Sequence, residues 1–471
     1  MSSGMSDVNR TIPEEFPAPR KFFYNLGTAG YTLLDSLQAS FLIYFFLPPK
    51  ESGLPELVSN KVYFGMFTIF GMVYIFGRIV DSVADPLVAY WSDRSRARMG
   101  RRKWFLTVGG LPLALFAVLC FFPPHTFSSN MNAVWLAIFL GGYYFFYTFY
   151  VAPFLALIPE LGHDESERIS ITTQQAFFSL VGAGVVMALP GLWSHLKAGG
   201  YGAVEAFQVA VVLLAIPGLI LVYSAPAAVN EKRFSSAQPV DVPFFESLLA
   251  TIKNRLFRVY LAANVLFWTA FHILRSTAMH YNRVVLKMPE DFYALLMVAL
   301  GVGTVCSFPL LKKLSVSRGQ VGVFKLGLIA FAAVSVFVPF MDATPLEAKW
   351  VGLTLFFAYG FPVAVLLVVP NALLADITEY EVALTGQDRQ CMFFGAQGLF
   401  MKICMGMGTA LIAALFGNFG KDVGNSLGVR LTAPTAAIFC IAAVALISAF
   451  PEKHMRDVID RARAKRFSTS I

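Results

Sequence analysis

The stretch "RIVDSVADPLVAYWSDRSRARMGRRK" (78–103) begins inside a long apolar segment and ends in a cluster of arginines. A single charge at the centre of a membrane-spanning helix costs ~2.5–3.5 kcal/mol on translocon scales. Arg78, Asp81 and Asp85 therefore need partners or water if this segment crosses a bilayer. At ~100° per residue the three side chains lie within about 60° of one another, so one stripe of a helix carries all three charges.

The composition of the whole chain supports a membrane location. Of its 471 residues, 57% are hydrophobic and 14% are charged, and the mean hydropathy is +0.63, which is more apolar than a soluble protein needs. Apolar runs long enough to span a bilayer predict twelve helices. They lie near 24–47, 62–90, 104–122, 131–157, 171–193, 204–224, 256–286, 292–311, 321–340, 349–373, 392–416 and 432–450.

The longest polar interruption, residues 230–255, divides these spans into six and six. This division predicts an all-α membrane protein with two pseudo-symmetric six-helix bundles, a plan common among secondary transporters. The predicted parts are an N-terminal segment (1–23), a first bundle (24–224), a central loop (225–255), a second bundle (256–450) and a basic tail (451–471). Apolar residues at helical spacing between 244 and 256 suit a helix lying on the membrane surface, and a solvated linker is the alternative.

Positive charges are concentrated in the loop 94–103 and in the tail, which predicts that these segments and both termini lie in the cytoplasm. The expected location is the inner (cytoplasmic) membrane, as a multi-pass protein. The net charge of +8 is explained by this topology, so no nucleic-acid partner is expected. The five cysteines show no CxxC spacing, and no phosphate-binding loop or HExxH motif is present. Neither a cofactor nor an enzymatic activity is expected, and a membrane sensor or enzyme is a remote alternative.

The charged stripe suggests a cation site. Pro86 follows Asp85 and removes a backbone donor, which frees carbonyl oxygens beside the acids. Two carboxylates with neutral oxygens suit a hard cation, and a like-charge pair also favours proton binding by one acid. The alternative is that Arg78 only neutralises Asp81 in an inert pair. Lys402, which is too deep in a later apolar segment to reach water easily, could keep the empty site neutral and release it to a cation.

Two segments, 78–104 and 375–402, resemble the glycoside–pentoside–hexuronide:cation symporters, the melibiose-carrier group of the major facilitator superfamily. The first contains D-x-x-x-D-P with a downstream G-R-R, and the second ends at a helix 11 lysine. The stretches "YTFYVAPFLALIPEL" (147–161) and "DESER" (164–168) extend the resemblance, which covers nearly the whole chain. It implies the major facilitator fold and a monomeric, cation-coupled symporter in the lipid bilayer. The implied small-molecule substrate is a sugar, glycoside or uronide.

The resemblance also implies roles for single residues. Asp81, Asp85 and Thr148 would bind the coupling cation, usually Na⁺, Li⁺ or H⁺, and coupling to the substrate would involve Lys402 and Arg78. A cytoplasmic gate would be formed by Asp93, Arg94, Arg101, Arg102, Arg168 and Asp376.

The substrate site departs from the melibiose carriers. The positions that grip the sugar there align with Thr32, Val151 and Gln175, so the usual clamp of two aspartates and an arginine is missing. An amphipathic anion such as a lysophospholipid is therefore an alternative cargo. The candidate substrate-binding residues are Asp35, Tyr31, Tyr147, Arg275 and Gln397.

Two of these candidates have open alternatives. Asp35 lies one turn beyond Thr32 and either replaces the lost aspartate or pairs with a structural partner. Arg275 lies deep in the seventh predicted span and either pairs with Asp35 or binds an anionic group of the substrate bidentately.

Overall fold

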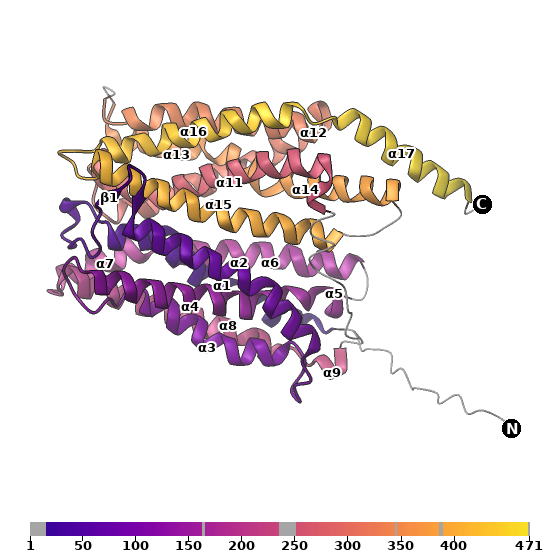
Figure 1. Cartoon of the computed structure of the whole chain (residues 1–471), viewed down its shortest axis with the longest axis horizontal. Coiled ribbons are helices and arrows are strands. Elements are labelled where there is room, and N and C mark those ends of the chain that lie inside the picture. The colour runs from indigo at the N-terminus through magenta and orange to yellow at the C-terminus, as the bar shows by residue number, and fades with distance from the viewer. Residues whose placement is uncertain (1–15, 163–164, 235–250, 344–345, 386–389, 470–471) are drawn as a thin grey trace.

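The computed structural model describes residues 16–162, 165–234, 251–343, 346–385 and 390–469. Long helices run side by side along one direction, and α1 begins near the end of the bundle at which α17 ends (Figure 1). We call this the terminal end. The opposite end, which carries the only described strand pair, is called the hairpin end.

The first half of the chain forms one group of helices and the second half another, stacked in Figure 1. The first half contains α1 (Ala18–Phe46), η1 (Lys50–Ser52), β1 (Val62–Tyr63), β2 (Phe67–Thr68), α2 (Ile69–Arg94), α3 (Lys103–Leu119), α4 (Asn130–Ala156), α5 (Ile158–Leu161), α6 (Glu165–Val186), α7 (Leu189–Ala198), α8 (Ala203–Ala228) and α9 (Glu231–Phe234). The second half contains α11 (Arg255–His280), η2 (Tyr281–Val285), α12 (Phe292–Phe337), η3 (Val338–Phe340), α13 (Ala348–Ala358), α14 (Gly360–Thr385), α15 (Gln390–Phe419), α16 (Leu427–Ser448) and α17 (Glu452–Thr469).

Eight helical stretches among the described residues are long and apolar enough to cross a membrane, which confirms the predicted all-α membrane architecture. The count of twelve spans stays a prediction, because α3 has only 17 residues and α2 carries five charged side chains. Within α12, Gly319 adopts φ 72° and ψ 172°, a conformation that glycine tolerates and that breaks the helix. This kink lies between the two spans predicted at 292–311 and 321–340.

The prediction that the second span starts at residue 62 is wrong, because residues 62–68 form a β-hairpin. Val62 pairs with Thr68, and the turn between the strands places Phe64 and Gly65 at φ 51° and 74°. Two successive positive φ values reverse the chain tightly and match the twist of paired strands. The Thr68 hydroxyl then accepts a hydrogen bond from the Gly71 amide at 3.0 Å, so α2 begins only at residue 69.

The core of the first half depends on a close approach of α1 and α8. A Cβ atom at Gly30 would lie 2.5 Å from the Val222 nitrogen and 2.8 Å from the Gly218 oxygen, so the two backbones touch. Small residues at such crossings drive helix association in membranes, where lipid is as apolar as leucine and packing must supply the attraction. This contact holds α1 in the centre of the first half, where most of its side chains are buried.

Each half uses a carboxylate after its last long helix to cap another helix. Glu231 of α9 accepts hydrogen bonds from the amides of Arg102, at 2.8 Å, and Lys103, at the start of α3. Glu452 of α17 accepts from the amides of Gln320 and Val321, at 3.0 and 3.3 Å, just after the kink in α12. These amides have no partner within their own helix, so the carboxylates satisfy donors that would otherwise be unpaired.

The two polar segments of the prediction have different outcomes. Most of the surface helix expected between 244 and 256 lies outside the described residues, which omit 235–250. The segment predicted as a basic tail forms α17, and its Met455 and Ile459 side chains are buried. The first part of α17 is therefore packed against the second half.

We expect Glu231→Ala and Glu452→Ala each to lower the melting temperature in detergent by a few degrees, because loss of a helix cap costs about 0.5–2 kcal/mol. The matched variant Asp460→Ala, which removes an exposed carboxylate of α17, should leave the melting temperature unchanged. Equal melting temperatures for all three variants would show that the caps do not contribute to stability.

Candidate ion-pair site between the two halves

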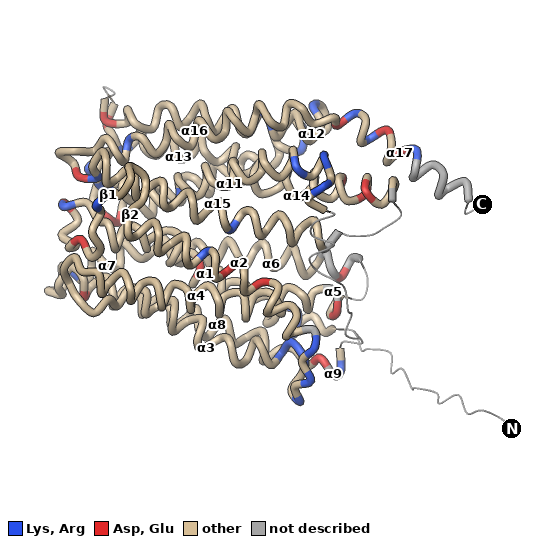
Figure 2. Tube along the Cα trace, in the orientation of Figure 1, with Lys and Arg blue, Asp and Glu red and all other residues tan. Residues whose placement is uncertain are grey.

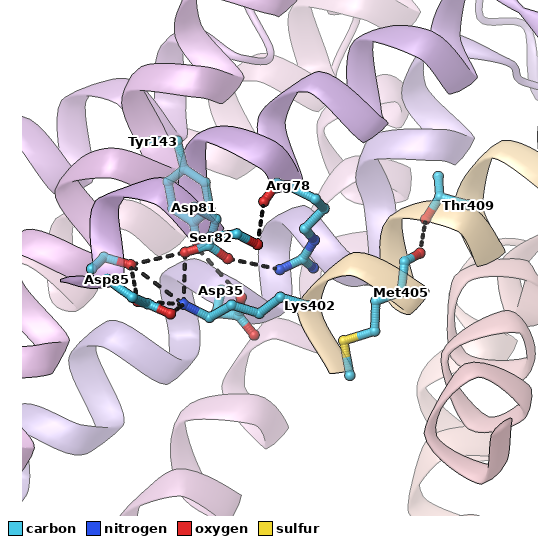
Figure 3. A network of polar contacts seen from close by, with 10 residues as sticks. Asp35, Arg78, Asp81, Ser82, Asp85, Tyr143, Lys402, Met405 and Thr409 are labelled. Carbon is cyan, nitrogen blue, oxygen red and sulfur yellow. Dashed lines mark hydrogen bonds and ion pairs between the residues drawn. The ribbon is translucent and has the colours of Figure 1, made fainter. Parts of the chain in front are cut away.

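Charged residues gather at the two ends of the molecule, and a few of the described ones lie in its middle, among them residues of α1, α2 and α15 (Figure 2). There the Lys402 ammonium lies 2.9 Å from Asp81 Oδ1 and 2.8 and 2.9 Å from the two carboxylate oxygens of Asp85 (Figure 3). The lysine comes from α15 in the second half and both acids come from α2 in the first. The predicted convergence of these three residues is therefore present, and it joins the two halves.

Two further residues of the first half complete the cluster. Thr148 of α4 has its hydroxyl oxygen 2.8 Å from Asp81 Oδ1 and 3.1 Å from Asp85 Oδ1, and it can donate to one of them. The Arg78 guanidinium donates to Asp81 Oδ2 at 3.3 Å and lies 4.4 Å from the centre of the Tyr144 ring. This cation–π contact with Tyr144 also holds the arginine in place.

The two acids differ in their surroundings. The Asp81 side chain is 1% exposed and is held by three partners, whereas the Asp85 side chain is 34% exposed. The Lys402 side chain is 23% exposed. Asp81 is thus fixed within the protein, and Asp85 is the acid that a solvated ion can reach.

The charges in the cluster cancel. Arg78 and Lys402 contribute two positive charges, and Asp81 and Asp85 contribute two negative ones. If the ammonium leaves, a single negative charge remains beside three hard oxygen ligands, those of the two acids and Thr148. Oxygen ligands of this kind suit small hard cations, and the ammonium now lies where such an ion would contact them.

A second polar region lies next to the cluster in Figure 3, around Asp35 of α1. The Tyr143 hydroxyl is 3.5 Å from Asp35 Oδ1, and the Tyr31 and Tyr147 rings meet edge to face with their centres 6.1 Å apart. Three of these four residues were predicted as substrate ligands, which stays a prediction, and the contact of Tyr143 with Asp35 was not predicted. The position of Tyr143 one turn before Tyr147 on α4 is the signal that could have identified it.

Arg275 does not pair with Asp35: no ion pair joins them among the described residues. Its Nε donates to the Ser40 hydroxyl at 3.2 Å, and its Nη2 is buried without a hydrogen-bond partner. Ser40 lies five residues beyond Asp35, or about 7.5 Å along α1, which explains why the predicted pair does not form. The Gln397 side chain accepts a hydrogen bond from the Tyr260 hydroxyl at 2.5 Å, so it is engaged in packing α15 against α11.

Three of the predicted gate residues, Arg94, Arg101 and Arg102, have partners in the first half. Arg101 and Arg102 lie 2.6 and 3.0 Å from one carboxylate oxygen of Glu160, the acid of α5. Arg94 donates to the Tyr90 hydroxyl at 2.5 Å. Asp376 is half-buried on α14, and the side chains of Asp93 and Arg168 lie outside the described part of the structure.

The partners that sequence reasoning missed at this end are Glu160 and Glu231. Glu160 lies just after the span predicted at 131–157, and Glu231 lies at the start of the polar interruption 230–255, both on the side of the membrane where the arginine cluster was expected. That placement is the signal that could have identified them, since an unpaired acid is not expected beside so many arginines.

The comparisons with known proteins agree with this arrangement. The sequence profile of a family described as "MFS/sugar transport protein" matches residues 23–451. The chain belongs to this family. MFS/sugar transport proteins are multi-pass membrane transporters, so the chain is a transporter with the major facilitator fold.

Two proteins of similar sequence and one of similar structure illustrate these comparisons. A protein of Escherichia coli strain K12 named as a glycoside/cation symporter is 23% identical over 385 residues, covering 80% of this chain and 81% of the relative. The raffinose carrier protein of Pediococcus pentosaceus is 21% identical and covers 88% of this chain and 64% of the carrier. The crystal structure of the nucleoside transporter NupG superposes with a TM-score of 0.61 at 13% identity, covering 91% of this chain and 99% of NupG. This last likeness concerns the fold alone.

We expect Lys402→Ala to destabilise the protein, because it leaves two carboxylates with one arginine. Removing one partner of a buried ion pair lowers the free energy of unfolding by ~3–5 kcal/mol. Because Lys402 and Asp85 are partly exposed, we expect a decrease of ~3 kcal/mol or less. The double variant Lys402→Ala/Asp85→Asn should recover part of the melting temperature, while Lys312→Ala, at an exposed lysine of α12, should have no effect. A double variant that is less stable than Lys402→Ala would contradict the charge balance described above.

Proposed function

We propose that this chain is a symporter that couples uptake of a sugar- or glycoside-class solute to one monovalent cation, either Na⁺ or H⁺. The observation that supports this proposal most directly is the ammonium of Lys402 held between Asp81 and Asp85, across the boundary of the two halves. The relatives named as a glycoside/cation symporter and a raffinose carrier favour the same class of cargo.

The proposed mechanism treats Lys402 as an internal substitute for the transported ion. With no cation bound, the lysine neutralises the acids and ties α15 to α2. A cation that binds Asp85, Asp81 and Thr148 would place three positive charges beside two carboxylates at low dielectric, so the ammonium is displaced. When the ammonium leaves, the contact between α15 of the second half and α2 of the first half is lost. Ion occupancy thereby alters the relative stability of the two orientations of the halves, as alternating access requires.

The charge count sets the proposed stoichiometry. Removing the ammonium leaves one net negative charge, so one monovalent ion restores neutrality. A proton on Asp85 would achieve the same charge balance as Na⁺. Both ions therefore remain in the proposal.

The solute site is proposed around Asp35, next to the ion cluster. A carboxylate can accept two hydrogen bonds from neighbouring sugar hydroxyls, and the rings of Tyr31 and Tyr147 offer apolar surface for the ring carbons. Asp35 would replace the sugar-gripping acids that this sequence lacks. Because it lies beside Arg78 and Tyr143, the solute would bind close to the cation.

We further propose that both ends of the chain lie in the cytoplasm and that the hairpin end faces the outside of the inner membrane. The basic groups of the loop between α2 and α3 and of α17 support this orientation, because both lie at the terminal end in Figure 2.

A second candidate cargo, an anionic solute, is favoured by Arg275. Its Nη2 is buried without a partner, and no carboxylate lies within 4 Å of this guanidinium among the described residues. An unpaired buried cation is costly, and a carboxylate or phosphate on the solute would compensate it. Such a solute would be a uronide or an amphipathic anion such as a lysophospholipid.

In proteoliposomes, Asp81→Asn and Asp85→Asn should abolish accumulation against a gradient and retain exchange of solute, since only the ion-driven step needs the acids. The measurement is uptake of labelled glycosides under an imposed Na⁺ or H⁺ gradient, compared with exchange at equal concentrations. Glu205→Gln, at an exposed acid in the first turn of α8, is the matched control. Accumulation equal to that of the unaltered protein in both aspartate variants would mean that the acids are structural.

The role of Arg275 is tested with neutral and anionic solutes in parallel. Arg275→Gln should weaken binding of an anionic glycoside at least ~10-fold, because hydrogen bonds to charged groups contribute about 1.5–3 kcal/mol, and should leave a neutral glycoside unaffected. Arg275→Lys should retain part of the affinity. The double variant Asp35→Asn/Arg275→Gln should be no better than Arg275→Gln, and rescue there would instead reveal an internal ion pair in another conformation. Equal losses for both solutes would exclude the anion-binding role.

A further inference from the structure

The turn between α15 and α16, residues 420–426, contacts the first half at three consecutive positions. We call it the latch turn. The Lys421 ammonium lies 2.8 Å from Glu56 Oε2. Asp422 accepts from the Lys50 amide at 2.9 Å and lies 3.4 Å from the ammonium of the same residue. The Val423 amide donates to Glu51 Oε1 at 2.9 Å. One turn of the second half is thus bound to the loop that follows α1.

The end of α11, η2 and the residues before α12 add a second set of contacts between the halves at the hairpin end. Arg283 Nη2 donates to the Glu51 carbonyl at 2.6 Å, and the His280 ring lies 3.1 Å from the Leu47 carbonyl. Glu290 accepts from the Lys197 ammonium of α7 at 3.2 Å and lies 3.8 Å from Arg283 Nε. Lys197 also lies over the ring of Trp193, which restricts its motion.

The latch turn is shaped by its own backbone. Gly420 has φ 82°, and the amides and carbonyls of Asp422 and Asn425 pair with each other at 3.0 and 3.1 Å. A Cβ at Gly420 would lie 2.4 Å from the Asn425 side chain, so the turn needs a glycine there. The three contacting residues are therefore presented together, and they engage or release as a unit.

The contacts differ in strength. The Lys50 side chain is 84% exposed, so its ion pair with Asp422 contributes little. The Lys421 and Glu290 side chains are both 9% exposed, so the Lys421–Glu56 and Lys197–Glu290 pairs are shielded from water on one side. Losing one partner of a shielded pair leaves a charge without compensation, which is the costly case. Of the ion pairs between the halves at the hairpin end, we therefore expect these two to contribute most to holding the halves together.

We propose that the latch turn, together with Glu290, is an ionic latch that closes the hairpin end of the transport path and must release before that end opens. The proposal rests on the proposed function, in which the halves rock about the central ion-pair cluster. Lys402 and Lys421 are connected through α15 and lie 19 residues apart, or about 28 Å along a helix. Displacement of Lys402 by a cation would therefore loosen the same helix that carries the latch turn, which makes release of the latch the second step of opening.

The test measures the distance between the halves directly. Spin labels at Ser128→Cys and Leu346→Cys, both exposed on opposite halves at the hairpin end, report that distance in a chain whose native cysteines are replaced. Lys421→Glu should shift the population toward longer distances, and the swap Lys421→Glu/Glu56→Lys should restore the short one. Lys61→Glu, the same charge reversal at the same end, at a lysine that lies over the Tyr63 ring of its own half, is the matched control. If Lys421→Glu prevents folding, the distance is measured instead in Lys421→Gln, which removes the charge without reversing it.

The outcomes separate the latch from the proposed function, because the distance measurement needs no solute. Longer distances in Lys421→Glu and Lys421→Gln, with restoration in the swap, support the latch even if no glycoside is transported. High salt should lengthen the distance in the unaltered protein and change the Lys421→Glu variant less, since screening weakens an ion pair that the variant lacks. Distances in Lys421→Glu equal to those of the unaltered protein and of Lys61→Glu would overturn the latch, whatever the transport assays show.

Discussion

The structure depends on an electrostatic requirement that neither half can meet alone. Among the described residues, Arg78 is the one cation of the first half that contacts Asp81 or Asp85, and Lys402 contacts no acid of its own half. Water would compensate these charges, but α2 and α15 place them in the apolar middle of the molecule (Figure 2). Bringing the two helices together removes both deficits, so the boundary between the halves is held where the charges are.

The same contact explains why the boundary can move. An ion pair inside a protein is strong while its geometry is kept, and its strength falls steeply when a competing cation or water reaches the acid. Asp85 is the more exposed acid, and Asp81 is held by Arg78 and Thr148. The arrangement therefore combines one fixed carboxylate with one exchangeable carboxylate, which suits a site that must load and unload repeatedly.

The sequence predicted those parts that depend on local pattern. Helical periodicity placed Arg78, Asp81 and Asp85 on one stripe, and the depth of Lys402 marked it as their partner. The hairpin at 62–68 was missed because its apolar residues resemble the start of a span, and only the two positive φ angles after Tyr63 distinguish it. The acid caps and the Arg275–Ser40 contact could not be predicted, since they depend on how far one helix is shifted along another.

The paired acid caps have a consequence for the order of synthesis. Glu231 emerges soon after the last long helix of the first half, so α3 can be completed while the second half is still being made. Glu452 lies among the last twenty residues of the chain, and until it leaves the ribosome the amides of Gln320 and Val321 have no carboxylate to bind. Domains generally fold as units during translation, the earlier one first. The start of each capped helix waits for a similar length of chain, 128 residues from Lys103 to Glu231 and 132 residues from Gln320 to Glu452. A chain cut after α16 would lack the acid that caps the part of α12 beyond Gly319.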